Sequence, residues 1–205
     1  MEAIDIIKNR RSVNHFDPSR KLDDETIKKI IDLAVNAPSA YNLQPWRIIV
    51  VKSDEEKEKF WNLAYKQPKI KDAAANLIIV GNKHGWDKDN PVWQELLQTV
   101  GGKTEVVENA QKGVANNYGS TDERQTAFAY LNAGLLAMSI MHSAQAMGID
   151  SHPMNGYDAE GLSKEFGLTE HEVPVMNICI GYFDKSKTLH PRRPRRGFDE
   201  IAKVV

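Results

Sequence analysis

The sequence is poor in cysteine and has no long apolar run. Cys179 is the only cysteine among 205 residues, so no disulfide can form within one chain. It lies in the apolar run 175–180, where a thiol usually behaves as a small buried hydrophobic group. No window approaches the roughly 18 apolar residues of a membrane-spanning helix. Residues 1–5 carry acids where a signal peptide needs basic residues. We therefore expect a cytoplasmic protein without a membrane partner.

The chain also lacks a surplus of charge of either sign. It has 27 basic and 28 acidic residues and a net charge of -1, which gives no support for a nucleic-acid partner. Positive charge is concentrated in two short places instead. One is the pair Arg10 and Arg11, and the other is the segment 185–196, which has six basic residues and no acidic one. Such clusters suit a small anionic group.

The signature motifs of several enzyme classes are absent. The sequence contains no Walker loop, no Gly-x-Gly-x-x-Gly fingerprint and no Gly-x-Ser-x-Gly elbow, which argues against the classical dinucleotide and hydrolase folds. The histidines show neither helical i, i+4 pairing nor the spacing of metal ligands. No metal site is therefore expected from His15, His84, His142, His152, His171 and His190.

Hydrophobic periodicity predicts one domain over residues 1–205, a length that one core can hold. Apolar spacing and capping residues indicate helices at 2–10, from Asp23 or Asp24 to before Pro38, and at 54–65, 122–147 and 158–166. Aliphatic runs predict strands at 47–51, 77–80, 149–153 and 173–182. This uneven alternation favours an α+β fold, a mixed central β-sheet wrapped by helices, over a strictly alternating parallel fold.

Three further segments have distinct roles in this prediction. Residues 84–120, interrupted by glycine and asparagine pairs, are expected to form a variable helical cover, and 184–205 form a C-terminal extension that lies on a surface. The long helix 122–147 carries its larger apolar side chains on one side and is rich in alanine, glycine and serine. Its small residues would allow another backbone to approach closely.

Four polar clusters are candidates for ligand binding. Arg10, Arg11 and Ser12 together offer the donors that a phosphate monoester needs, although a short basic run is more often a solvated patch. The amides of Asn42 and Gln44 lie in the turn 38–46, which precedes a predicted core strand. Such amides can bind a heteroaromatic ring with alternating donors and acceptors. The alternative is an Asx turn beside a buried Trp46.

The other two clusters are weaker when taken alone. Gly156 could bring its backbone N–H against a ligand edge where a side chain would collide, but Asn155-Gly156 is also an ordinary turn signal. The arginines at 192–196 could pair with a phosphate, or they could form a solvated basic tail. Two basic clusters and one amide-rich turn together suggest a ligand with a phosphate at one end and a planar ring at the other.

Taken in order, these clusters resemble the nitroreductase family of flavin enzymes. The resemblance is carried by residues 10–16, the turn 37–46, the turn 153–156, residues 180–182 and the arginines 192–196, and it spans nearly the whole chain apart from about 84–120. The family implies an α+β fold and an obligate homodimer with two FMN sites at the interface. It also implies NAD(P)H-driven reduction of nitroaromatics, quinones or related acceptors.

The resemblance implies roles for particular residues. Arg10, Arg11 and Ser12 would contact the FMN phosphate and the pyrimidine edge of the ring, and Asn14 would face its N1/O2 side. The partner subunit would supply its own copies of three turn residues, Pro38, Ser39 and Asn42, with Gln44 as a neighbouring candidate. Gly156 would offer its N–H near flavin N5. The remaining cofactor-binding candidates are Lys69, Pro153, Met154, Asn155, Arg193 and Arg195.

Two positions depart from the pattern of the family. Many relatives carry Lys or Arg where this chain has Asn14, so a charge that would stabilise anionic reduced flavin is missing. A common subgroup has Glu where this chain has Asn155, so nicotinamide handling and substrate range would differ.

The resulting hypothesis is an FMN-dependent oxidoreductase that passes a hydride from NADH or NADPH through flavin N5 to a small-molecule acceptor, in a ping-pong sequence. The flavin carries the bond chemistry, so no side chain is assigned as general acid or base. The long helix 122–147 is expected at the dimer interface, with its small-residue face as the seam. Alternatives are an enone reductase or dehalogenase of the same fold, a non-catalytic flavin-binding protein and, more distantly, a nucleic-acid binder with a basic tail.

Overall fold

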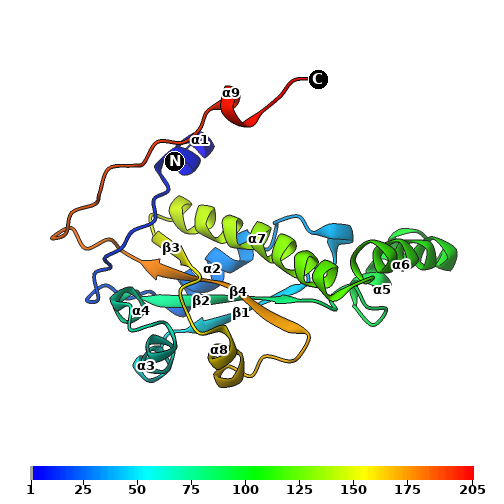
Figure 1. Cartoon of the computed structure of the whole chain (residues 1–205), viewed down its shortest axis with the longest axis horizontal. Coiled ribbons are helices and arrows are strands. Elements are labelled where there is room, and N and C mark those ends of the chain that lie inside the picture. The colour runs from blue at the N-terminus through cyan, green and yellow to red at the C-terminus, as the bar shows by residue number, and fades with distance from the viewer. Residues whose placement is uncertain (1) are drawn as a thin grey trace.

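A four-stranded antiparallel sheet forms the centre of the protein (Figure 1). The structure, a computed structural model, describes residues 2–205. The strand order is β1-β2-β4-β3, and the strands are β1 Trp46–Val51, β2 Ala75–Asn82, β3 Asp150–Met154 and β4 Glu172–Gly181. A parallel bridge joins Ser12 to Ser151 on β3. The predicted α+β fold with a helix-wrapped sheet is confirmed.

The two inner strands explain why the sheet is covered on both faces. Residues 77–80 of β2 have no exposed surface, and β4 is almost as deeply buried from Val175 onward. A strand that is apolar on consecutive residues must bury both of its faces. Helices therefore pack against each side of the sheet.

One face of the sheet is covered by α7 Asp122–Ala146 and α2 Asp24–Ala34 (Figure 1). The side chains of Thr121 and Asp23 cap the two helices by accepting hydrogen bonds from backbone N–H groups, which satisfies donors that have no partner within the helix. Gly148 ends α7 with φ of +71°, the left-handed conformation expected of a glycine there. The sheet-facing side of α7 mixes small residues such as Ala133 and Ala137 with larger aliphatic ones.

This packing decides which side chains of α7 could meet a partner. The small residues Ala133 and Ala137 are fully buried inside their own chain, so this part of the expected small-residue seam is not free to meet another subunit. Gly134 has open space where a Cβ would lie. Leu131, Leu135 and Met138 are 58%, 41% and 37% exposed. The outward face therefore carries large apolar side chains as well as a glycine, and a dimer seam on α7 stays a prediction.

The other face of the sheet is covered by α3 Asp54–Leu63, α4 Pro68–Asp72 and α8 Ala159–Glu165. Phe60 of α3 is completely buried between Tyr157 and Phe166, with ring centroids 6.2 and 6.1 Å away. The sequence did not predict α4, which begins with Pro68 after the left-handed residues Tyr65 and Lys66 and the N-cap Gln67. Five residues are too few to show a helical period.

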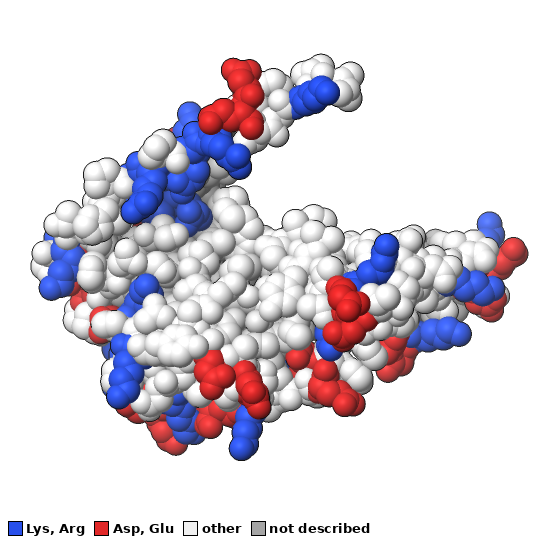
Figure 2. All heavy atoms as spheres, in the orientation of Figure 1, with Lys and Arg blue, Asp and Glu red and all other residues white. Residues whose placement is uncertain are grey.

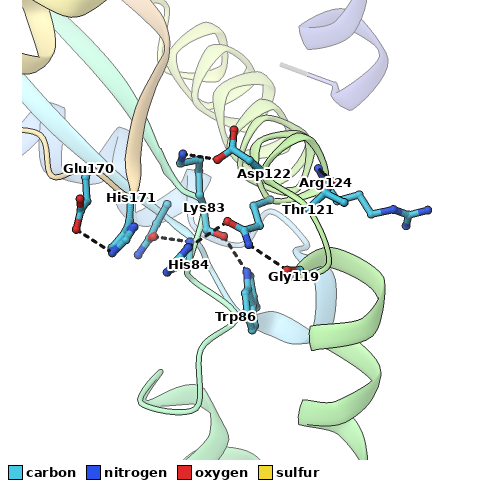
Figure 3. A network of polar contacts seen from close by, with 11 residues as sticks. Lys83, His84, Trp86, Gly119, Thr121, Asp122, Arg124, Glu170 and His171 are labelled. Atoms are coloured by element: carbon cyan, nitrogen blue, oxygen red, sulfur yellow. Dashed lines mark hydrogen bonds and ion pairs between the residues drawn. The ribbon is translucent and has the colours of Figure 1, made fainter.

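Two helices extend from one end of the sheet, α5 Val92–Thr99 and α6 Thr104–Tyr118, both within the segment 84–120 (Figure 1). A polar network joins their base to the start of α7 (Figure 3). Lys83 Nζ lies 2.8 Å from an Asp122 carboxylate oxygen, His84 contacts Gln125, and Trp86 donates to the Lys83 carbonyl. The imidazoles of His84 and His171 stack with centroids 3.9 Å apart.

The N-terminal helix and the C-terminal extension lie beside each other, near the end of α7 that is farther from α5 and α6 (Figure 1). Here α1 Ala3–Asn9 packs near the C-terminal extension, which ends with the short α9 Phe198–Ile201. Over residues 2–205 no helix combines the length and apolarity that crossing a membrane requires, and this includes α7.

Candidate cofactor site

A strongly basic cavity lies between the loop after α1 and the C-terminal extension. Its volume is about 280 Å³, and Figure 2 shows the lysine and arginine side chains gathered in this region of the surface. Six of the predicted site residues line it, and a fifth arginine, Arg192, lies beside them. The lining residues are Arg10, Arg11, Ser12, Asn14, Thr188, Leu189, His190, Pro191, Arg192, Arg193 and Arg195.

Two of these arginines hold the extension in place. Arg192 donates from one guanidinium nitrogen to the carbonyls of Lys8 and Arg10, at 2.6 and 3.0 Å, and Arg11 donates to the carbonyl of His190. Predicted residues from the two ends of the sequence are thus brought together. Arg195 also donates to backbone, to the carbonyls of Arg193 and Pro194. Each guanidinium has five N–H donors, so the arginines of the cavity all keep donors for a ligand.

The charge in this cavity is uncompensated. Burial lowers the pKa of Arg10, and the neighbouring charges of Arg192, Arg195 and Arg11 lower it further. None of the residues that line the cavity in the described chain is acidic. Guanidinium groups gathered in this way repel one another, and an anion bound among them would relieve that repulsion through charge-assisted hydrogen bonds. The chemistry of the donors therefore fits a phosphate.

The amide-rich turn is a strained segment held against α7. The short helix η1 Ala40–Asn42 contains Tyr41 and Asn42 at φ of 53° and 57°, and Gln44 follows at 47°. Left-handed backbone costs an ordinary residue of the order of 1 kcal/mol, and such strain clusters at ligand sites. Ser39 Oγ accepts a hydrogen bond from the Gln44 N–H, and the Gln44 amide donates to the Asn42 carbonyl.

This turn and the basic cavity do not meet within one chain. The Ala40 N–H donates to Asn132 Oδ1 in the first half of α7. Arg10 lies instead close to His142 in the second half: burial lowers the pKa of this histidine, and the charge of Arg10 lowers it further. Ten residues of α-helix separate Asn132 from His142, which is about 15 Å along the axis. Pro38, Ser39, Asn42 and Gln44 are absent from the cavity lining.

The turn at Gly156 leaves room where a side chain would collide. A Cβ on Gly156 would lie 2.9 Å from Gln67 Nε2, which donates to the Gly156 carbonyl at 2.8 Å. When the oxygen and nitrogen of the Asn155 amide are assigned so that both have hydrogen-bond partners, the nitrogen donates to the carbonyls of Met154 and Val175. The Met154 side chain is buried, with its sulfur 3.9 Å from that of Cys179. Met154 thus directs its side chain into the core, whereas Asn155 and Gly156 are exposed.

Lys69 belongs to a chain of polar contacts that the sequence did not reveal. Its Nζ lies 3.3 Å from His152 Nε2 and 3.5 Å from Gln67 Oε1, while His152 Nδ1 lies 2.9 Å from the Val13 carbonyl. Burial, and then the charge of Lys69, lower the pKa of His152 to about 4. Gln67 and His152 were not among the predicted site residues, because neither lies in a recognisable motif.

The described residues contain no group of three or more histidine, cysteine or acidic side chains that could hold a metal ion. The stacked pair His84 and His171 is the nearest approach to such a cluster. Its surroundings, an amide and two separate carboxylates, do not converge on one point.

Comparison with known proteins identifies the family of this chain. Residues 7–182 match the sequence profile described as the Nitroreductase family. YodC of Bacillus subtilis, provisionally named an NAD(P)H nitroreductase, is 34% identical over 179 residues, covering 87% of this chain and 88% of its own. A protein of Lactiplantibacillus plantarum named CLA biosynthesis enone reductase is 31% identical, covering 88% of this chain and 85% of its own.

Solved structures with the same fold are also of this family. The crystal structure of ydfN from Bacillus subtilis, provisionally a nitroreductase, has a TM-score of 0.90 at 29% identity and covers 98% of both chains. A provisional nitroreductase from Exiguobacterium sibiricum, crystallised in complex with FMN, has a TM-score of 0.85 at 26% identity, covering 100% of this chain and 98% of its own. The sequence profile and these relatives lead to one conclusion: this chain belongs to the nitroreductase family of oxidoreductases.

Proposed function

We propose that this protein is a homodimeric, FMN-dependent oxidoreductase that uses NADH or NADPH to reduce nitroaromatic, quinone or similar acceptors. The observation that carries the proposal is the cavity of about 280 Å³ lined by five arginines and no acidic residue. Its location between residues 10–14 and 188–195 matches the place where the resemblance expects the phosphate. The similar protein from Exiguobacterium sibiricum was crystallised with FMN.

The residues present fit both ends of FMN. Arg10, Arg193 and Arg195 would bind the phosphate, with Ser12 adding a hydroxyl donor. The planar ring would lie against the backbone of Gly156, where a Cβ would come within 2.9 Å of Gln67 Nε2. Asn14, Pro153 and the amides of the turn 38–44 would read the polar edges of the ring.

A homodimer would complete this site. The turn of one chain contacts the middle of α7 at Asn132, and the arginines of the same chain lie closer to the C-terminal end of the helix. Exposed apolar side chains line this stretch of the helix: Leu131, Leu135 and Met138. In the view of Figure 2 the surface along α7 carries few charged side chains. A two-fold axis across this stripe would bury it and carry each turn to the arginines of the partner. Each cofactor would then contact both subunits.

When bound, FMN would supply the redox chemistry by accepting a hydride from NAD(P)H and delivering it to the acceptor. The protein's own groups would hold the ring in a fixed orientation, keep the phosphate paired and leave one face open to both substrates in turn. No proton transfer needs to be assigned to a side chain of this protein.

The test is a visible spectrum of the purified protein with anaerobic titrations of NADH and NADPH. We expect flavin absorbance that is bleached by at least one of them and restored by a quinone or nitroaromatic, together with sedimentation as a dimer. A colourless protein that takes up no added FMN would overturn the proposal.

A second candidate function is reduction of an enone, since the enone reductase is 31% identical to this chain. A panel of nitroaromatics, quinones and α,β-unsaturated ketones distinguishes the two by relative kcat/KM. A flavin-binding protein without catalysis would keep its colour and oxidise neither NADH nor NADPH with any acceptor.

A further inference from the structure

Three polar side chains are buried in the core on the side of the sheet that α4 covers. Lys57 of α3 is 2% exposed, and Asn76 of β2 and Asn177 of β4 have no exposed surface. Asn177 Nδ2 donates to Asn76 Oδ1 at 3.2 Å and thereby orients it. Burying a polar group costs free energy unless a hydrogen bond compensates it, and burying a charge costs more. Lys57 and Asn76 therefore both need partners in the core.

The partners of these two side chains lie at the C-terminal end of α4. Lys57 Nζ donates to the carbonyl of Ala73 at 2.5 Å and to that of Lys71 at 3.5 Å. Asn76 Nδ2 donates to the carbonyl of Ile70 at 2.8 Å. The last carbonyls of a helix have no partner within it. Here a buried cation and a buried amide supply the donors, and the cation also suits the negative end of the helix dipole.

Keeping Lys57 in the core has a cost that an apolar side chain would avoid. Burial lowers the pKa of Lys57, the charge of Lys21 lowers it further, and the carboxylates of Asp54 and Asp72 offset only part of this effect. A helix as short as α4, with five residues, is not stable by itself. The ammonium group thus does what hydrophobic packing alone does not, because it holds the carbonyls that end this helix.

The other end of α4 supports the glycine turn. Gln67 is the N-cap residue of the helix, and the Ile70 N–H donates to its carbonyl at 3.1 Å. The side chain of Gln67 does not cap α4 but donates from Nε2 to the carbonyl of Gly156 at 2.8 Å. A single short helix therefore joins the buried donors at its C-terminal end to the turn at Gly156.

We propose that Lys57 is a positioning residue of the cofactor site: its buried ammonium group fixes the end of α4, so that Gln67 holds the Gly156 turn against the flavin ring. This role rests on the proposed function, in which the ring lies against the backbone of Gly156. Because Lys57 is buried, it acts through α4 and not by contact with the ring. Without its ammonium group two carbonyls lose their donor, and α4 becomes free to shift.

The test is a double-mutant cycle for FMN affinity with the variants K57M, Q67A and K57M/Q67A, measured by fluorescence titration of the apoproteins. Methionine is an unbranched side chain like lysine but donates no hydrogen bond. We expect FMN to bind about tenfold more weakly in each single variant, with no further loss in the double variant, because both changes release the same turn. K59M is the matched control, since Lys59 lies on the same helix but pairs with Glu56, and its FMN affinity should equal that of wild type.

A second measurement needs no flavin. Nitrogen-15 NMR of the apoprotein should show that the side-chain amide of Gln67 is shifted in K57M and unshifted in K59M. If K57M does not fold, K57Q takes its place in both experiments, since glutamine is polar but shorter and uncharged.

The outcomes separate the role of Lys57 from the proposed function. Additive losses in the cycle, wild-type affinity in K57M or Q67A, or an unshifted Gln67 amide would overturn this role while FMN binding by the wild-type protein leaves the proposed function intact. A lower free energy of unfolding in K57M with unchanged FMN affinity would mean that Lys57 only stabilises the fold. A wild-type protein that binds no FMN would overturn both.

Discussion

Asn132 joins the strained amide turn to the middle of α7. Its Oδ1 accepts a hydrogen bond of 2.8 Å from the Ala40 N–H, its Nδ2 donates to the Phe128 carbonyl at 2.7 Å, and its side chain is 1% exposed. One buried amide thereby satisfies a backbone donor of the turn and a carbonyl of the helix. The left-handed residues of the turn are held in place by the long helix that also packs on the sheet.

The variant N132A should therefore lower the free energy of unfolding by about 2–3 kcal/mol, because it leaves a buried N–H without a partner and opens a small cavity. The measurement is urea denaturation of the protein. N62A is a matched control, since Asn62 makes a similar hydrogen bond to the carbonyl four residues earlier but is exposed. A loss no larger than that of N62A would show that Asn132 does not support the turn.

The arginines of the basic cavity should control cofactor retention. R195A and R10A each remove a charge-assisted hydrogen bond to a phosphate, worth about 1.5–3 kcal/mol, so FMN should bind roughly 10- to 100-fold more weakly. Fluorescence titration of the apoprotein with FMN measures this, and riboflavin, which lacks the phosphate, should bind the variants and wild type equally. R196A is the control, because Arg196 does not line the cavity. If R196A weakens FMN binding as much as R195A does, the loss reflects the overall positive charge of the extension and not a specific contact of Arg195 with the phosphate.

Replacing Gly156 by alanine should weaken FMN binding without destabilising the fold. In G156A the new methyl group meets Gln67 Nε2, the end of a flexible side chain, so the unfolding midpoint should change little. The same methyl group would occupy the space proposed for the ring, and FMN affinity should fall at least tenfold. G197A, at a glycine with open space around it, should alter neither quantity. An unchanged affinity in G156A would remove this glycine from the proposed site.

The sequence predicted features that depend on local interactions better than features that depend on distant contacts. The start of α2 at its cap Asp23 and the end of α7 before Gly148 were found because the signals lie within a few residues of each boundary. The contact between Lys69 and His152 joins residues 83 positions apart. It exists because α4 packs beside the edge strand β3, and no pattern in either segment encodes that approach.

The outward face of α7 illustrates a different limit. Periodicity placed the larger apolar side chains of the helix on one side, but it did not reveal which of them the sheet would bury. Packing against β2 and β4 buried Ala133 together with Leu136 and left Leu135 outside. That choice depends on the shape of the sheet and not on hydrophobicity alone.

The exposed stripe on α7 should be required for assembly and, through it, for cofactor binding. L135E introduces a charge into the face formed with Leu131 and Met138, and burying an unpaired carboxylate in an interface costs several kcal/mol. We expect a folded monomer by analytical ultracentrifugation and a parallel loss of FMN, because the turn 38–44 would no longer reach the arginines of a partner. Y65E, at an apolar side chain that is 69% exposed away from α7, is the control. A dimeric L135E, or a monomer that still retains FMN, would show that the site is complete without this face.

The neutral state of His152 should make stability depend on pH. Its pKa is lowered to about 4 in the folded protein from the ordinary histidine value of 6.5, so the unfolded chain binds the proton more readily than the folded one. The contribution of His152 is present above about pH 6.5 and is lost as the pH falls toward 4. Urea denaturation between pH 8 and 4.5 should therefore show a decline in the free energy of unfolding that is shallower in H152Q. Identical slopes for the two proteins would mean that His152 is as easily protonated when folded as when unfolded, and the hydrogen bond that Lys69 donates to it would then have to be abandoned.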